Sequence, residues 1–199
     1  MNLQITDVPL PVRLQYQTPL TDEELLRFSA GNEVVWIERE ADGTLYVKPI
    51  LATMEGCITG EINCDLAQWT DADGRGETLG RCGYLLPDGS MRGAPISWVL
   101  KERMAQLEQR ERDGYPRLAP DFVAEVMSVF DDPAYLLRKM DQWIANGVQV
   151  AWLVDPKERS VTIYRRRGAR TPRPPYLRPG HRPTPPPSRA PAPSPGSNW

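Results

Sequence analysis

The sequence predicts a mixed α/β fold in which helices cover a sheet with a parallel pair of strands at its centre. Residues 122–127 and 148–155 are short apolar runs rich in valine, as expected of strands that are buried on both faces. A helical pattern of apolar residues at 133–145 separates them, and the order strand, helix, strand favours a parallel pair. Further strands are predicted at 34–40 and 44–48, on either side of a hairpin signal, and at 161–164, where polar and apolar residues alternate.

The first helix is expected at residues 21–31. Thr21 and Glu24 have the spacing of a capping box, in which each side chain bonds the backbone N–H of the other residue. Strands 34–40 and 44–48 follow, and the Ala-Asp-Gly sequence between them is typical of a hairpin. The N-terminal half of the domain is therefore expected to begin with a helix and a two-stranded unit.

Apolar residues recur every three or four positions from residue 56 to residue 69, which predicts a helix packed on the sheet. Cys57 and Cys64 are expected to be small buried residues of this helix. The remaining predicted elements are strands at 79–86 and 94–99, the second opening with proline, and one polar surface helix at 101–112.

Composition divides the chain into an N-terminal extension (1–19), an α/β domain (20–165) and a tail (166–199). From Arg165 onwards the chain contains 11 of the 21 prolines, eight arginines and no acidic residue. Such a segment cannot bury enough apolar surface to offset its ordering entropy, so we expect a disordered Pro/Arg-rich tail. Taking these eight from the 24 lysines and arginines leaves 16 basic against 26 acidic residues. The domain is therefore expected to be acidic overall, with room only for a local basic groove.

Several classes of function are disfavoured by the residues that the chain lacks. Its single histidine, His181, lies in the tail, which argues against Ser-His-Asp, Cys-His and histidine-based metal sites. The three cysteines match no zinc or redox spacing, and this favours a reducing, cytoplasmic setting. A leader sequence and an apolar run of about eighteen residues are both missing, so neither secretion nor a membrane partner is expected. The chemistry that remains uses carboxylates and lysine.

Glu125 is the first candidate for that chemistry, because it interrupts an apolar strand where an uncompensated carboxylate is costly. Lys139 lies three residues after Leu136 and four before Trp143, so it borders the apolar stripe of its helix. Its ammonium group can therefore point at the sheet, towards Glu125. A carboxylate that holds a divalent metal beside an ammonium is the core of a metal-dependent phosphodiesterase site. The alternative is a Glu–Lys ion pair that only supports the fold.

Two further carboxylates have open interpretations. Glu38 follows the apolar run of the first hairpin strand, and it is either a metal ligand or a solvated carboxylate at a strand end. Asp88 lies in the sequence Pro-Asp-Gly-Ser, where aspartate is typical of a turn.

Six segments, taken together, resemble the restriction endonuclease family of the PD-(D/E)XK nuclease superfamily. They cover nearly all of residues 20–165 and read LTDEELLRF, VWIEREADGTLYVKP, LLPDGSMRGAPISWV, PDFVAEVMS, KMDQWIANGVQVAWLVDP and VTIYR. The resemblance implies the restriction-endonuclease-like fold, a central mixed sheet flanked by helices. It also implies that DNA is the partner and that phosphodiester hydrolysis depends on Mg²⁺ or Mn²⁺. Cutting both strands needs two active sites, with which a homodimer is compatible.

The resemblance also assigns roles to three residues. Glu125 matches the strand carboxylate that binds metal. Lys139 matches a lysine that assists the attacking water and that lies, in this family, on the helix after the strand. Glu38 matches an N-terminal glutamate of the family. These three are the expected catalytic residues.

One departure from the family pattern bears on activity. Where relatives show S-P-D-x-S/A-W, with the aspartate as principal metal ligand, residues 94–98 read A-P-I-S-W, one residue short and without a carboxylate. Asp88 is the nearest acidic residue upstream and becomes the candidate second metal ligand beside Glu125. Magnesium usually needs one or two carboxylates, so we expect weak metal binding and an endonuclease of impaired activity. The alternatives are a catalytically inactive DNA-binding or scaffolding relative, and a working tail that binds partners or nucleic acid.

Overall fold

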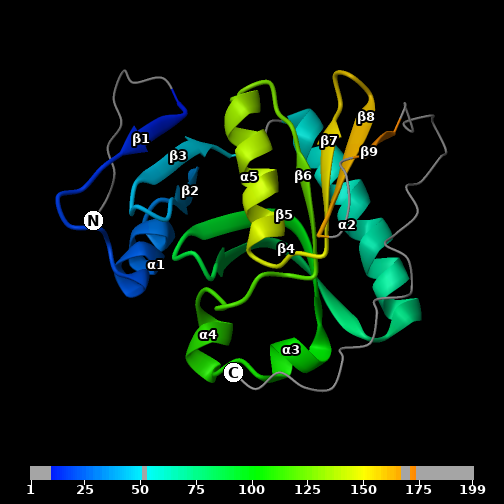
Figure 1. The fold of residues 1–199 in the computed structure, drawn as a ribbon, viewed down its shortest axis with the longest axis horizontal. Coiled ribbons are helices and arrows are strands. Elements are labelled where there is room, and N and C mark those ends of the chain that lie inside the picture. Colours follow the sequence, from blue (N-terminus) through cyan, green and yellow to red (C-terminus); the bar gives the residue numbers. More distant parts are fainter. Residues whose placement is uncertain (1–9, 51–52, 167–170, 174–199) are drawn as a thin grey trace.

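The computed structural model describes residues 10–50, 53–166 and 171–173, which build a nine-stranded mixed sheet with helices on both faces (Figure 1). The strand order is β1-β3-β2-β5-β6-β7-β8-β9, and β4 pairs with β5 beside this path. A large mixed sheet flanked by helices is the architecture that the sequence predicts, so the predicted fold class is confirmed.

The N-terminal part forms one end of the sheet. Strands β2 (Val35–Arg39) and β3 (Leu45–Pro49) form the predicted hairpin, and α1 (Asp22–Ala30) packs beside it. The capping box is present, because Thr21 N donates to Glu24 Oε2 at 2.8 Å and Glu24 N donates to Thr21 Oγ1 at 3.3 Å. Within the predicted extension, β1 (Val12–Leu14) pairs with β3. Three residues are too few to show alternation, so the sequence does not predict this strand.

The predicted unit of strand, helix and strand is confirmed at the centre of the fold. Strands β6 (Phe122–Val126) and β7 (Val150–Asp155) are parallel, and α5 (Pro133–Ala145) connects them. The side chain of Asp132 caps α5 by accepting from Ala134 N at 3.0 Å. Strand β8 (Ser160–Arg165) pairs with β7 in the antiparallel sense.

Strands β4 (Gly76–Leu85) and β5 (Met91–Leu100) pair over most of their length, and both begin three residues earlier than predicted. Pro95 therefore lies inside β5 rather than at its start. β2 pairs with β5 only at Met91, and β6 pairs with it only from Ile96. A residue without an N–H is tolerated between these two points, because no neighbouring strand bonds that edge there.

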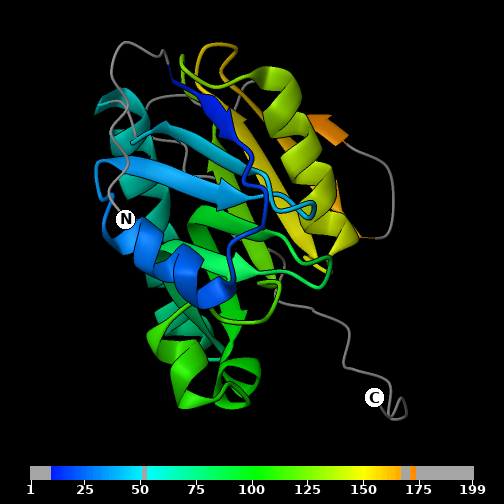
Figure 2. The ribbon, with the colours of Figure 1, turned by 90° about the vertical axis from the view of Figure 1, so that its left-hand side faces the viewer.

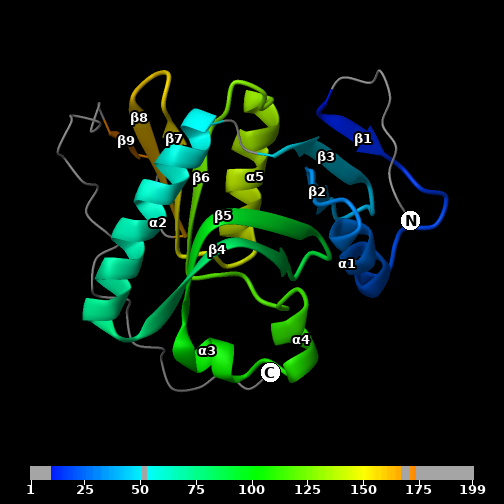
Figure 3. The ribbon, with the colours of Figure 1, turned by 180° about the vertical axis from the view of Figure 1, so that it is seen from behind.

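Helices α2 (Thr53–Asp73) and α5 cover opposite faces of the sheet, as Figures 2 and 3 show. The helix α2 is longer than predicted, and its inner side packs Leu66 against β5 and β6. Cys57 and Cys64 are exposed, so the expectation that they are buried is wrong. Their spacing of seven places both on one side of the helix, and the apolar residues at 58, 62 and 66 take the side that faces the sheet.

The single helix predicted at 101–112 is also wrong, because the structure has two short helices, α3 (Lys101–Ala105) and α4 (Gln109–Asp113). Leu107 lies between them and packs against the core under α5. Glu108 then starts the second helix through a capping box with Glu111. Because the segment is mostly polar, its sequence does not reveal that Met104 and Leu107 both pack against the core.

The predicted tail is described only in small part. Thr171–Arg173 form β9, which pairs antiparallel with β8, so these three residues depart from the expectation of disorder. The rest of the tail beyond residue 166 and residues 1–9 of the predicted extension lie outside the described residues. Within the described part of the chain, no helix has the length and apolar character needed to cross a membrane.

Candidate active site

The predicted catalytic residues meet where the sheet opens between β2 and β6, a region called the wedge below. β5 borders the wedge from Met91, where it pairs with β2, to Ile96, where it begins to pair with β6. The other edge of β5 is paired with β4. In this gap the backbone of Gly93 bonds side chains instead of a strand. Its N–H donates to Glu38 Oε1 at 3.2 Å, and its carbonyl accepts from Lys139 Nζ at 2.8 Å.

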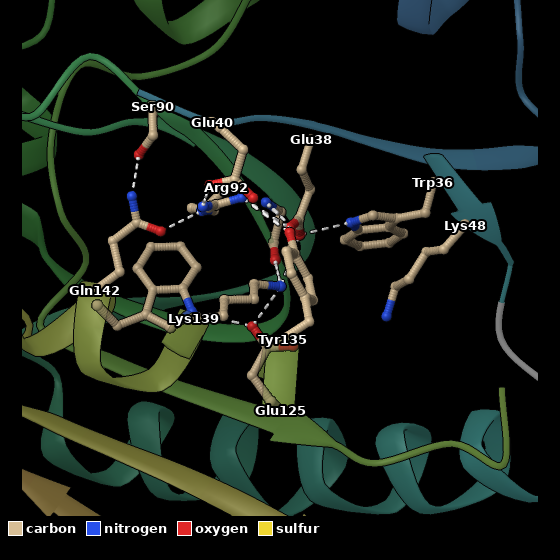
Figure 4. A network of polar contacts seen from close by, with 12 residues as sticks. Trp36, Glu38, Glu40, Lys48, Ser90, Arg92, Glu125, Tyr135, Lys139 and Gln142 are labelled. Atoms are coloured by element: carbon tan, nitrogen blue, oxygen red, sulfur yellow. Dashed lines mark hydrogen bonds and ion pairs between the residues drawn. The ribbon is translucent and has the colours of Figure 1, made fainter. Parts of the chain in front are cut away.

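Lys139 joins the two glutamates that the sequence singles out (Figure 4). Its Nζ lies 2.7 Å from Glu38 Oε1 and 2.8 Å from Glu125 Oε1. The exposed fractions of Lys139, Glu38 and Glu125 are 2%, 0% and 3%. The predicted approach of Lys139 to Glu125 is therefore confirmed. The expectation of a solvated Glu38 is wrong, because α5 covers its side chain and brings Lys139 and Tyr135 into contact with the carboxylate.

Glu38 is saturated with hydrogen-bond donors. Besides Gly93 and Lys139, Oε1 accepts from Trp36 Nε1 at 3.0 Å. Oε2 accepts from the Tyr135 hydroxyl at 2.6 Å and from Arg92 Nη1 at 3.5 Å. Five donors from β2, β5 and α5 thus hold this carboxylate in place. A buried carboxylate needs such partners, because each unpaired buried charge is strongly unfavourable.

Arg92 extends the network away from the wedge. It is 2% exposed, pairs with Glu40 and donates to the Tyr135 hydroxyl at 2.9 Å. Its Nε donates to Gln142 Oε1 at 2.6 Å. Gln142 Nε2 in turn donates to Asp88 Oδ2 at 2.7 Å. The network therefore runs from the turn between β4 and β5 to the wedge.

Asp88 lies at the outer end of this network. Its Oδ1 accepts from Ser90 N at 3.0 Å and Ser90 Oγ at 2.6 Å, and its Oδ2 also accepts from Asn146 Nδ2 at 2.9 Å. Partial burial alone would raise the pKa of Asp88, but the hydrogen bonds from Ser90, Gln142 and Asn146 lower it to about 2. The contacts of Asp88 are those of a turn residue, and none of them, within the described chain, is with Glu125.

The surroundings of the two buried glutamates shift their pKa values in opposite directions. Burial alone would raise the pKa of Glu38, but the cations Lys139, Arg92 and Lys48 outweigh it and lower the pKa to about 2. Burial raises the pKa of Glu125, and the charge of Glu38 adds to this effect against the opposing attraction of Lys139. Glu38 therefore stays ionised, and Glu125 is the carboxylate that accepts a proton first.

The whole α/β region matches a known family. The model of the Uma2 family, described as "Putative restriction endonuclease", matches residues 22–190. The chain belongs to this family. The match continues beyond residue 165, where the sequence places the end of the domain. No curated protein matches the chain.

A solved structure supports the same fold. The chain is similar to a crystal structure from Anabaena variabilis, described as a "putative nuclease belonging to DUF820", with a TM-score of 0.65. The two are 20% identical, and the match covers 77% of this chain and 84% of the other. The restriction-endonuclease-like fold is thereby confirmed for this member of the Uma2 family. Members of the wider nuclease group generally use divalent metals, and the family implies a DNA substrate.

The donor set of the wedge does not fit a tightly held Mg²⁺ ion. Magnesium prefers six oxygen ligands in octahedral geometry, usually with one or two carboxylates. Both oxygens of Glu38 already accept hydrogen bonds, and Lys139 and Trp143 Nε1 (3.0 Å) both contact Oε1 of Glu125. Oε2 of Glu125 is the oxygen left for another ligand. The described residues contain no group of three His, Cys, Asp or Glu side chains able to hold a metal.

Glu38, Glu125 and Lys139 form a cluster with the four other side chains that donate to the two glutamates, namely Trp36, Arg92, Tyr135 and Trp143. The sequence predicts none of these four as a site residue. Trp36 and Tyr135 occur in patterns that indicate only packing. Arg92 could have been predicted from the sequence, because it is the one charged residue in the segment that forms the almost wholly buried strand β5. The reasoning that singled out Glu125 applies equally to Arg92.

Proposed function

We propose that this member of the Uma2 family is a DNA endonuclease whose metal-dependent phosphodiester hydrolysis is reduced or lost. Family membership supports the substrate and the reaction class. The observation that carries the impairment is the closed cluster in the wedge, where Glu38 is saturated and Glu125 is the single carboxylate with an oxygen to offer. Glu125 and Lys139 are proposed as what remains of the catalytic residues, and Glu38 as the group that fixes Lys139.

We propose position 95 as the place of the missing carboxylate. The antiparallel register pairs Ile96 with Ala124, so residue 95 lies one step beyond, opposite Glu125. Pro95 occupies that place and carries no ligand atom. Asp88, the candidate replacement, is held in its turn by Ser90, Gln142 and Asn146. A second carboxylate at position 95 would therefore lie beside Glu125, whereas Asp88 would first have to leave its partners.

The test is cleavage of supercoiled plasmid by the full chain in Mg²⁺ and then in Mn²⁺, with Glu125→Gln, Pro95→Asp and the control Glu158→Gln. Glu158 lies in the turn between β7 and β8, so its variant changes the same charge away from the wedge. We expect slow or absent nicking by the unaltered chain and faster nicking by Pro95→Asp. Calorimetric titration of Mg²⁺ should show tighter binding by the same variant.

Fast cleavage by the unaltered chain that Glu125→Gln abolishes would show a working site and contradict the impairment. A chain that binds DNA but neither cuts nor gains cleavage from Pro95→Asp would favour the second candidate, an inactive DNA-binding or scaffolding relative. The closed hydrogen bonding of Glu38 favours that candidate too. The homodimer and the cytoplasmic setting stay predictions.

A further inference from the structure

An exposed arginine of β4 lies over the cluster. Cζ of Arg81 is 5.4 Å from the centre of the Trp36 ring, and the indole N–H of Trp36 donates to Glu38 Oε1. The indole also packs on Gly93, at the border of the wedge. Arg81 forms no ion pair with any residue that the structure describes, so its charge is available to a ligand.

The backbone of Arg81 is strained. Its φ is +50°, in the left-handed region that residues other than glycine rarely adopt. The register pairs Gly80 with Ile96 and Cys82 with Ala94, so Arg81 faces Pro95. Glycine would fit this conformation without steric cost. Strained residues of this kind occur often at functional sites, and the strain here coincides with the border of the wedge.

Packing alone does not account for an arginine at this position. The stacking contact between an exposed cation and an indole stabilises the fold only slightly. The left-handed conformation of the backbone destabilises it by about the same amount, so the contact gives no net gain in stability. Two other cations lie beside the cluster: Lys48 is already neutralised, because its Nζ lies 2.9 Å from Asp131 Oδ1, and Arg13 lies over the rings of Tyr46 and Tyr135 rather than over Trp36. In a domain with an excess of acidic residues, an unpaired guanidinium next to the wedge is the group best able to attract an anion.

We propose that Arg81 binds a phosphate of the DNA backbone at the wedge. The planar guanidinium can donate two parallel hydrogen bonds to a phosphate, and contacts of this type fix the position of a duplex without reading its sequence. The inference rests on the proposed DNA substrate and adds to it the residue that positions DNA over Glu38 and Glu125. Arg81 is thus a binding residue, and it binds whether or not the cluster still cleaves.

The experiment compares Arg81→Gly, Arg81→Lys and Arg159→Gly in the full chain. Arg159, in the turn between β7 and β8, also has φ +50°, so glycine relieves the same strain there. Binding of a labelled DNA duplex is measured by fluorescence anisotropy at several salt concentrations, with EDTA present to prevent cleavage. Thermal unfolding of each variant is recorded alongside.

Arg81→Gly should weaken binding about fivefold to tenfold at ~0.1 M salt and reduce the slope of log K against log salt by about 0.9, the value for one phosphate. Its melting temperature should not fall, because glycine fits the backbone better. Arg159→Gly should leave affinity and slope unchanged, and Arg81→Lys should keep the slope.

Four results would overturn the inference. If the unaltered chain binds DNA and Arg81→Gly binds equally well, Arg81 makes no phosphate contact, and the proposed function stands. If Arg159→Gly weakens binding as much, the effect is one of overall charge. If Arg81→Gly and Arg81→Lys lose stability and affinity together, the role of Arg81 is structural. No binding by the unaltered chain would overturn both this inference and the proposed DNA substrate.

Discussion

Replacing Lys139 by methionine would leave the buried glutamates without their shared cation. Methionine has a similar length and no charge, so the change isolates the charge of the ammonium. Removing one partner of a buried ion pair costs about 3–5 kcal/mol. The Gly93 carbonyl also loses its donor, which adds about 1–3 kcal/mol to the loss. We therefore expect a loss of about 4–8 kcal/mol in the free energy of unfolding at neutral pH, comparable to the whole stability of many domains.

The loss should depend on pH, with a sign that follows from the two carboxylates. The pKa of Glu38 is lowered from 4.5 to about 2, so its ionised form contributes roughly 3 kcal/mol above pH 4.5, and this is lost as the pH falls through 2. Without Lys139 the pKa of each carboxyl rises, and protonation relieves the repulsion between Glu38 and Glu125. The penalty should therefore be larger at pH 7 than at pH 5.

Urea denaturation followed by tryptophan fluorescence measures both effects. The control is Lys157→Met, at a lysine in the exposed turn after β7, which should change stability by less than about 0.5 kcal/mol. The double variant Lys139→Met with Glu125→Gln removes one of the facing carboxylates and should recover part of the loss. It also gives a measurement if the single variant does not fold. A loss below about 1 kcal/mol at pH 7, or an equal loss at both pH values, would refute the conclusion that Lys139 compensates the charges of Glu38 and Glu125.

Two further predictions concern packing and exposure. In Gly93→Ala the new Cβ would lie 2.3 Å from the Trp36 ring, so we expect a loss of about 1–3 kcal/mol in urea denaturation and altered tryptophan fluorescence; unchanged stability would mean that the ring moves freely. Cys57 and Cys64 are exposed and should react at once with a thiol reagent, whereas Cys82 should react slowly because burial raises its pKa. Three equally fast thiols in the folded protein would contradict the half-buried position of Cys82 on β4.

Much of the candidate site could be predicted from single charged residues that interrupt apolar patterns. Glu125 stands out as a charge in an apolar strand, and Lys139 as a charge at the border of an apolar helical stripe. Their approach follows because a helix that connects two parallel strands packs back on them. Glu38 could be placed on a strand but not in the interior, since its burial depends on α5, almost a hundred residues later in the chain, covering that face of β2.

The errors in the fold have related causes. Pro95 looks like the start of a strand, because a proline disrupts pairing with a neighbouring strand. It lies inside β5 only because β2 and β6 leave that edge of β5 unpaired. The helix predicted at 101–112 is broken because Leu107 packs on a core built from residues far away in the chain.

The sequence by itself determined the α/β class, the central unit of strand, helix and strand, and the family resemblance, since these depend on the periodicity of nearby residues and on the chemistry of short segments. Only the tertiary structure decided that Lys139 bridges two glutamates, that Arg92 and Tyr135 saturate one of them, and that Arg81 lies over Trp36. These contacts join residues that are many positions apart. Their distances follow from the pairing and opening of the strands, which no local pattern of residues specifies.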